Sequence, residues 1–165
     1  VKDQMDFNER LATFGGQEGA IGFFCAGEGE GLPHCNSAKA LAHDDFLLSA
    51  FIEGLYERLH ALYSSSLSRA EKLKRREKVF RQAAEDFQKN RGDFLTDSYR
   101  LIDREPLNNA TILAFRTYHR HLLFYQKVYK RLDRNLRQTI DLFRYAAHSR
   151  ADPLAWAASW LGETE

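Results

Sequence analysis

The most restrictive feature of this sequence is a helix near its start that contains several glycines. Residues about 6 to 26 follow a helical period, with Phe7, Leu11 and Phe14 in one apolar row. The row beside it holds one carboxylate and three small side chains: Glu9, Ala12, Gly16 and Ala20. Four glycines fall in this stretch, and each costs about 1 kcal/mol relative to alanine inside a helix. We therefore expect another helix to pack closely against the small side chains and offset that cost.

The rest of the chain predicts further helices and no convincing strand. The expected helices cover residues about 38–63, 69–90, 94–103, 108–131, 133–148 and 153 onward. Their expected caps are Asn36 or Ser37, a capping box of Ser68 with Glu71, and Asp152 with Pro153. The predicted fold class is all-α, a single-domain multi-helix bundle over residues 1–165, in which the Gly-rich stretch 27–36 is a loop.

Two of these helices have a side that the pattern predicts to be buried. In the helix 108–131 the apolar or aromatic row is Ala110, Ala114, Tyr118, His121, Tyr125, Val128 and Leu132. In the helix 69–90 the corresponding line is Leu73, Phe80, Ala84 and Phe87. His119 and His121 stand at i, i+2 and point to opposite sides of a helix, so we do not expect them to chelate a metal together.

Charge and hydropathy exclude two classes of partner. The segment Arg69 to Arg91 holds nine basic and four acidic residues, a stripe that nucleic-acid binding would need. The acidic residues interrupt it, Glu71 can pair with Arg75 at i, i+4, and no aromatic side chains stand ready to stack on bases. We therefore expect a solvated helix face and no nucleic acid. No apolar run approaches the roughly 20 residues that span a bilayer, so the chain contains no predicted membrane-spanning segment.

Two blocks of sequence resemble a known family. The first reads Phe7-Asn8-Glu9, Ala12-Thr13-Phe14 and Glu18-Gly19-Ala20, and the second reads Leu107-Asn108-Asn109-Ala110-Thr111 followed by Thr117-Tyr118-His119. Both are similar to segments of the predicted bacterial zinc aminopeptidases of the gluzincin type. In that family the first block follows a His-Glu-x-x-His helix and supplies a glutamate as the third zinc ligand.

The resemblance implies a role for four residues, and each has a simpler alternative. Glu9 would be the third metal ligand, or else a solvated glutamate favoured by the helix dipole. Tyr118 would donate to the oxyanion of the tetrahedral intermediate, or else be a core tyrosine. Asn108 and Asn109 would bind the peptide substrate, or else cap a helix.

The sequence departs from the family at the metal site. None of its six histidines belongs to a His-Glu-x-x-His motif. This motif supplies the two imidazoles, one helical turn apart, that bind the zinc. We therefore expect this chain to be the C-terminal part of a longer peptidase, with zinc bound only in the intact protein and no activity in the isolated piece. Its partners would be a peptide substrate and the N-terminal part of the same protein, and the resemblance implies the bacterial cell envelope. The alternative is a non-catalytic helical module that binds another protein.

Cys25 and Cys35 flank the Gly-rich stretch. In an oxidising compartment they could form a disulfide, and in the cytosol they would remain one buried and one exposed thiol. The sequence leaves both possibilities open.

Overall fold

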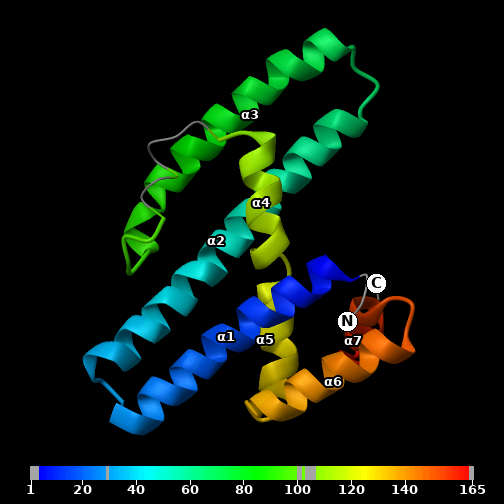
Figure 1. Cartoon of the computed structure of the whole chain (residues 1–165). Coiled ribbons are helices and arrows are strands. Elements are labelled where there is room, and N and C mark those ends of the chain that lie inside the picture. The colour runs from blue at the N-terminus through cyan, green and yellow to red at the C-terminus, as the bar shows by residue number, and fades with distance from the viewer. Residues whose placement is uncertain (1–3, 29, 100–101, 103–106, 164–165) are drawn as a thin grey trace.

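The computed structural model describes residues 4–28, 30–99, 102 and 107–163. Within these ranges the protein consists of helices and has no strand, which confirms the all-α prediction (Figure 1). The helices are α1 (Met5–Glu28), α2 (Pro33–Ser64), α3 (Arg69–Lys89), the short 3-10 helix η1 (Arg91–Asp93), α4 (Asn109–His119), α5 (Leu122–Arg131), α6 (Leu136–Ser149) and α7 (Pro153–Leu161).

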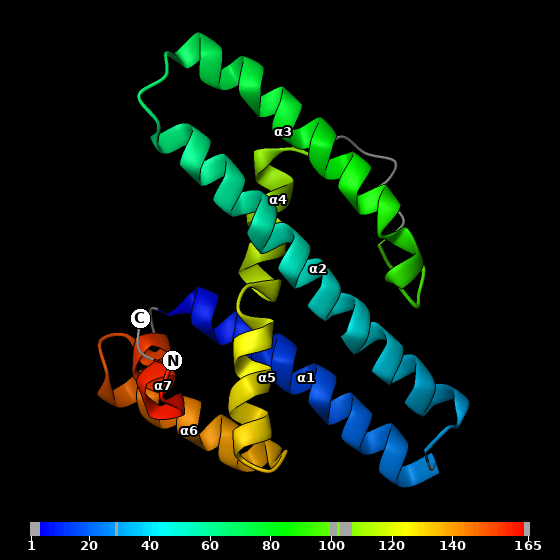
Figure 2. The ribbon, with the colours of Figure 1, turned by 180° about the vertical axis from the view of Figure 1, so that it is seen from behind.

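Two long hairpins set the shape of the molecule. α1 and α2 form the first, and α3 folds back along α2 to form the second, which projects from the body as an arm (Figures 1 and 2). α4 and α5 follow one another across α2 and α1, and α6 and α7 complete the body beside α5. α1 therefore packs against helices from both halves of the chain.

The two halves of the molecule have separate hydrophobic cores. One core joins α2, α3 and α4 and contains Leu48, Ile52, Leu55, Leu59, Ala83, Phe87, Ile102, Leu107 and Ile112. The other joins α1, α5, α6 and α7 and contains Phe7, Phe14, Leu122, Tyr125, Val128, Phe143, Ala147 and Ala157. Aromatic stacking of Phe14 on Tyr125, with ring centroids 5.8 Å apart, fixes α1 on α5 in the second core.

The prediction of one continuous helix over residues 108–131 is wrong, because the chain breaks at His121. His121 has the left-handed backbone conformation, with φ at 65°, and it separates α4 from α5. The break lets Ile112 enter the first core while Leu122 and Val128 enter the second. A single straight helix could not pack in both cores. Tertiary packing therefore determines the conformation at this point in spite of the local helical preference.

The burial predicted for this segment is also only partly right. Tyr125 and Val128 are buried, but Ala110, Ala114 and Tyr118 are exposed. They lie on the outward side of α4, because Ile112 and Arg116 are the residues that α4 buries. On α3, Phe87 is buried as predicted, whereas Leu73 is exposed on the projecting arm.

Several predicted boundaries shift, and others are confirmed. α2 begins at Pro33 instead of after Asn36 or Ser37, because proline suits the first helical turn. α6 is capped by Asn135, so it starts after the expected position near residue 133. Residues 94–99 are not helical, contrary to the helix predicted over 94–103, and the rest of that range lies largely outside the described residues. The Ser68 capping box and the Asp152 cap with Pro153 are confirmed.

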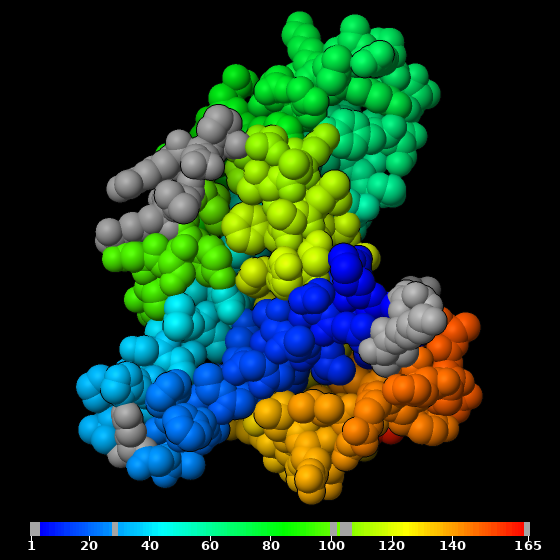
Figure 3. Space-filling model, in the orientation of Figure 1, coloured from blue at the N-terminus to red at the C-terminus, as the bar shows by residue number. Residues whose placement is uncertain are grey.

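The expectation that another helix packs against the small side chains of α1 is met at only some of them. No described side chain would contact a Cβ placed at Gly16, whereas Cβ atoms at Gly15 and Gly19 would meet Ile140 and Leu136 of α6 at 3.9 and 3.8 Å. The expected helix packing therefore occurs at Gly15 and Gly19, whereas the row of Glu9, Ala12 and Gly16 stays uncovered. Figure 3 shows α1 running across the visible face of the molecule, with no described helix over its outward side.

A disulfide between Cys25 and Cys35 joins the end of α1 to the start of α2. The two cysteines are 10 residues apart, and Gly31 at φ 90° lets the chain reverse between them. Closing a loop of this length is worth about 3 kcal/mol, mainly because it restricts the unfolded chain. The disulfide thus fixes the far end of the α1–α2 hairpin.

Within the described residues, no helix combines the length and apolar character that crossing a bilayer requires.

Candidate functional site

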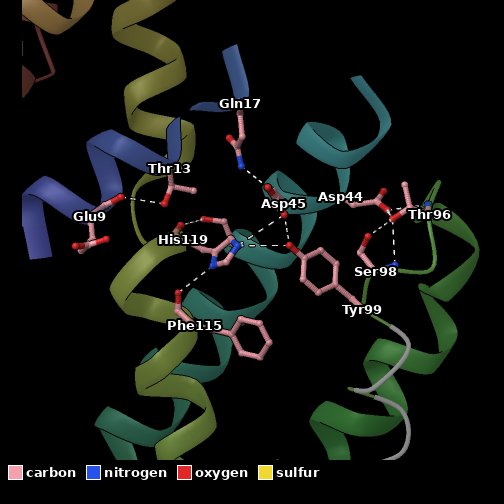
Figure 4. A network of polar contacts seen from close by, with 11 residues as sticks. Glu9, Thr13, Gln17, Asp44, Asp45, Thr96, Ser98, Tyr99, Phe115 and His119 are labelled. Atoms are coloured by element: carbon pink, nitrogen blue, oxygen red, sulfur yellow. Dashed lines mark hydrogen bonds and ion pairs between the residues drawn. The ribbon is translucent and has the colours of Figure 1, made fainter. Parts of the chain in front are cut away.

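Glu9 lies on the second turn of α1 and is half-buried. Its main-chain carbonyl accepts a hydrogen bond of 2.9 Å from the Thr13 hydroxyl, while its carboxylate points away from that contact (Figure 4). Among the described residues, none forms a hydrogen bond or ion pair with this carboxylate. The outward row that Glu9 leads, with Ala12 and Gly16, is the uncovered side of α1.

Arg10, the residue after Glu9, holds α1 against the end of α4 by a hydrogen bond. Arg10 is buried, and its guanidinium donates to the Arg116 carbonyl at 3.3 Å and to the Asp6 carboxylate at 2.9 Å. Burial lowers the pKa of Arg10, although the nearby Asp6 charge acts in the opposite direction. Arg116 in turn pairs with Glu53 of α2 at 3.1 Å. The helix that carries Glu9 is therefore held at the crossing of α1, α2 and α4.

A polar network lies next to this crossing and joins four segments (Figure 4). The Asp45 carboxylate of α2 accepts hydrogen bonds from Gln17 of α1 and from the Tyr99 hydroxyl, and it lies 3.7 Å from Nε2 of His119. Burial opposes ionisation of Asp45, but the contacts with His119, Tyr99 and Gln17 outweigh it and keep its pKa below the ordinary value. Burial, together with the Asp45 charge, raises the pKa of Tyr99, so the hydroxyl remains a donor.

The neighbouring Asp44 attaches the irregular segment 94–99 to α2. Its fully buried carboxylate accepts hydrogen bonds from the main-chain N–H groups of Leu95 and Thr96, both at 2.8 Å, and from the Thr96 hydroxyl at 2.6 Å. This attachment places Tyr99 over Asp45. Ser49, one turn further along α2, donates to the His119 carbonyl at 2.5 Å and fixes the end of α4.

No hydrogen bond joins Tyr118 to Glu9 among the described residues. Tyr118 is 47% exposed on α4. It follows Arg116 by two residues, so the two side chains point about 200° apart around the helix axis. Its hydroxyl has no hydrogen-bond partner among the described residues. The alternative reading of Tyr118 as a core tyrosine is therefore wrong, and its predicted role in oxyanion binding remains a prediction.

Asn108 and Asn109 lie at the opposite end of α4. Asn108 caps the helix, because its side chain accepts from the Thr111 N–H at 3.0 Å. Asn109 accepts from the Tyr63 hydroxyl at 3.0 Å beside a hollow of about 200 Å³. The hollow is lined by Tyr56, Leu59, His60, Tyr63, Asn109, Ile112 and Leu113. Nine residues of helix separate Asn109 from Tyr118, a distance of about 14 Å along the axis.

The described residues contain no group of three or more histidine, cysteine, aspartate or glutamate side chains arranged to hold a metal ion. His119 and His121 do not act together, since the helix break separates them and His119 faces Asp45. Glu9 is thus a single candidate ligand, and the rest of a metal site would have to come from outside these residues.

Comparison with known proteins bears on this arrangement. The family model described as "Putative aminopeptidase" matches residues 1–152, which include α1 with Glu9 and α4 with both asparagines. The chain belongs to this family. No curated protein and no solved structure gives a significant match.

In this aminopeptidase-family chain, sequence reasoning missed the network around Asp45. On the sequence alone, His119 is considered only for joint metal chelation with His121, and neither Tyr99 nor Asp44 stands out. The sequence signal for this network is the pair Asp44 and Asp45, which stand among apolar residues inside a long predicted helix. Carboxylates buried in such a place need hydrogen-bond donors, so the pair indicates a polar network. The donors come from residues 17, 95, 96, 99 and 119, which only the fold brings together.

His121, at the break between α4 and α5, should make the stability of the protein sensitive to acid. Burial, followed by the Arg120 charge, lowers the pKa of His121 from 6.5 to about 4. Between these two values the unfolded chain takes up a proton that the folded chain does not, so stability falls as the pH falls from about 6.5 towards 4. Because solvent screens a half-buried group, we expect a loss of about 1–2 kcal/mol.

The measurement is urea unfolding at pH 7 and pH 4.5 for the natural protein and for His121→Asn. Asparagine tolerates the left-handed conformation and does not titrate. The variant should lose less stability on acidification, whereas His148→Asn, at an exposed histidine of α6, should behave like the natural protein. Equal losses in all three proteins would refute the assignment to His121.

Proposed function

We propose that this protein forms part of a zinc-dependent aminopeptidase that hydrolyses N-terminal peptide bonds, and that Glu9 is one of the zinc ligands. The observation that carries the proposal is the Glu9 carboxylate itself. It is half-buried, it lacks a hydrogen-bond or ion-pair partner among the described residues, and it leads an uncovered row of small side chains. A cation bound here would give this carboxylate the partner that the described residues do not supply.

The surroundings of Glu9 favour packing of a further segment against α1. Ala12 and Gly16 leave the outward side of the helix low and open, which allows another backbone to approach closely. Such a segment could bring the two imidazoles that a catalytic zinc site needs. The described residues alone do not complete the site, so no catalytic step follows from them. When bound, zinc would polarise the carbonyl of the substrate and activate a water molecule.

We further propose secondary roles for Tyr118 and Asn109. Tyr118 is exposed and its hydroxyl has no hydrogen-bond partner among the described residues, so this side chain is available to a substrate or to a packing segment. Asn109 lies seven residues before Arg116 on α4, about 10 Å along the helix from the α1 crossing. An extended peptide covers that distance in about three residues. Asn109, and Asn108 beside it, would then contact the substrate away from its N-terminal amine.

The Cys25–Cys35 disulfide supports a location in an oxidising compartment. Disulfides persist outside the cytosol and are rare inside it. This is compatible with the bacterial cell envelope that the family resemblance implies.

The proposal is tested by metal analysis and peptidase assay of the full natural gene product. We expect about one zinc per chain by inductively coupled plasma mass spectrometry, and release of 4-nitroaniline from aminoacyl substrates that a chelator abolishes and added zinc restores. A full gene product that purifies without zinc and cleaves none of these substrates would refute the proposal. A non-catalytic helical interaction module would then be the better account.

A further inference from the structure

We propose that the groove between α2 and α3 binds an acidic peptide segment in an extended conformation. The groove has a volume of about 450 Å³. Its lining residues belong to α2 and α3, the two helices that form the arm in Figure 1. It is lined by Arg58, Leu62, Arg75, Lys78, Val79 and Gln82. Three of these six side chains are cationic and none is acidic, so the groove complements a negatively charged ligand.

Two of the cations are available to such a ligand. Arg75 and Lys78 are exposed, and no described carboxylate lies within ion-pair distance of either. The nearby acidic groups of α3 form their hydrogen bonds and ion pairs elsewhere, although the Glu71 charge still acts on Arg75 at longer range. Glu71 accepts hydrogen bonds from the main-chain N–H and the hydroxyl of the helix cap at 3.1 and 2.7 Å, and Glu77 pairs with the neighbouring arginine at 2.6 Å.

The opposite end of the groove is closer to neutral. Arg58 lies 3.4 Å from the Asp86 carboxylate, which also accepts a hydrogen bond from Gln82 at 3.1 Å. The pair is exposed and weak, but it leaves less free positive charge at this end. An anionic ligand should therefore concentrate its charge near Arg75 and Lys78.

The spacing of the two available cations favours a particular ligand. Arg75 and Lys78 are three residues apart on one face of α3, so their Cβ atoms lie about 5–6 Å apart. In an extended peptide, alternate side chains point to the same side about 7 Å apart. Two carboxylates separated by one residue can thus meet both cations. Leu62 and Val79 are half-buried and offer an apolar surface for a side chain next to the acidic pair.

A nucleic acid fits the groove less well. The lining includes no aromatic side chain on which a base could stack. Glu71 and Glu77 also interrupt the basic surface of α3 on both sides of Arg75, which opposes a continuous phosphate backbone. The chemistry favours a short acidic peptide.

The test is fluorescence anisotropy of the purified protein with a fluorescein-labelled peptide, Gly-Glu-Ala-Glu-Ala-Leu-Gly. The groove variant is Arg75→Glu with Lys78→Glu. Its matched control is Lys74→Glu with Arg81→Glu, which makes the same change of net charge at exposed positions of α3 that do not line the groove. All the altered residues are exposed, so thermal unfolding should confirm that both variants fold.

We expect the groove variant to lose about tenfold or more in affinity and the control to lose about twofold or less. The same peptide with glutamine in place of glutamate should not bind. Equal losses in both variants, or no binding of the acidic peptide to the natural protein, would overturn the proposal. Tighter binding of a single-stranded oligonucleotide than of the peptide, lost in the groove variant, would overturn it in favour of a nucleic-acid site.

Discussion

Replacing Glu9 with alanine in the full gene product should abolish zinc retention and lower kcat/KM by more than about a hundredfold. Loss of a group that only supports a ligand already costs roughly 10- to 100-fold in metal affinity or activity, and loss of a direct ligand should cost more. The folded structure should be unaffected, because the Glu9 carboxylate contacts no described partner and alanine favours a helix. Zinc content, steady-state kinetics and thermal unfolding would be measured on the same preparation.

Two further variants separate a ligand from a merely nearby charge. Glu9→Asp keeps the charge but withdraws the carboxylate by one methylene group, so it should lose most of the zinc. Glu57→Ala removes an exposed carboxylate from α2 and should change neither zinc content nor kcat/KM. If Glu9→Ala retained one zinc and normal kinetics, Glu9 would be a solvated helical glutamate, the simpler reading of the sequence.

Local features of the fold could be predicted from the sequence because they depend on neighbouring residues. The capping box of Ser68 with Glu71 and the cap of Asp152 before Pro153 are each formed within a few residues, and both are confirmed. The all-α class follows from helical periodicity repeated along the chain. Glu9 was likewise placed correctly on the first helix.

Features that depend on packing could not be predicted in the same way. No residue near His121 signals the end of a helix. The left-handed conformation of His121 arises because α4 packs in the first core and α5 packs in the second. Helix packing against the glycines of α1 occurs at Gly15 and Gly19 and not at Gly16, because the rotation of α1 about its axis decides which row faces α6. The candidate site is affected by the same rotation, which leaves Glu9 on the uncovered side.

The polar network explains how a chain with two cores keeps α1 in one position. Arg10 and Gln17 of α1 meet Arg116 of α4 and Asp45 of α2, respectively. These hydrogen bonds act together with the apolar packing of the two cores. Because buried hydrogen bonds have defined geometry, the network specifies the orientation of α1 and with it the direction of Glu9.

Asp44→Ala should be the most destabilising single substitution in this network, at about 3 kcal/mol. Asp44 is fully buried and accepts three hydrogen bonds from Leu95 and Thr96. Removing the carboxylate leaves two main-chain N–H groups without their acceptor, at about 1–3 kcal/mol each, and water can compensate part of this because Leu95 is exposed. Urea unfolding would give the loss, and amide hydrogen exchange at Leu95 and Thr96 should become faster.

Thr96→Ala removes one of the three hydrogen bonds and should cost about 1 kcal/mol. Combined with Asp44→Ala it should add less than that, because the two residues share a contact. Asp141→Ala, at an exposed aspartate paired with Arg144 on α6, should change stability by less than about 0.5 kcal/mol. Were Asp44→Ala as stable as Asp141→Ala, the segment 94–99 would be held by Phe94 and Tyr99 in the first core instead. In that case apolar packing, and not the Asp44 carboxylate, would position Tyr99 beside Asp45.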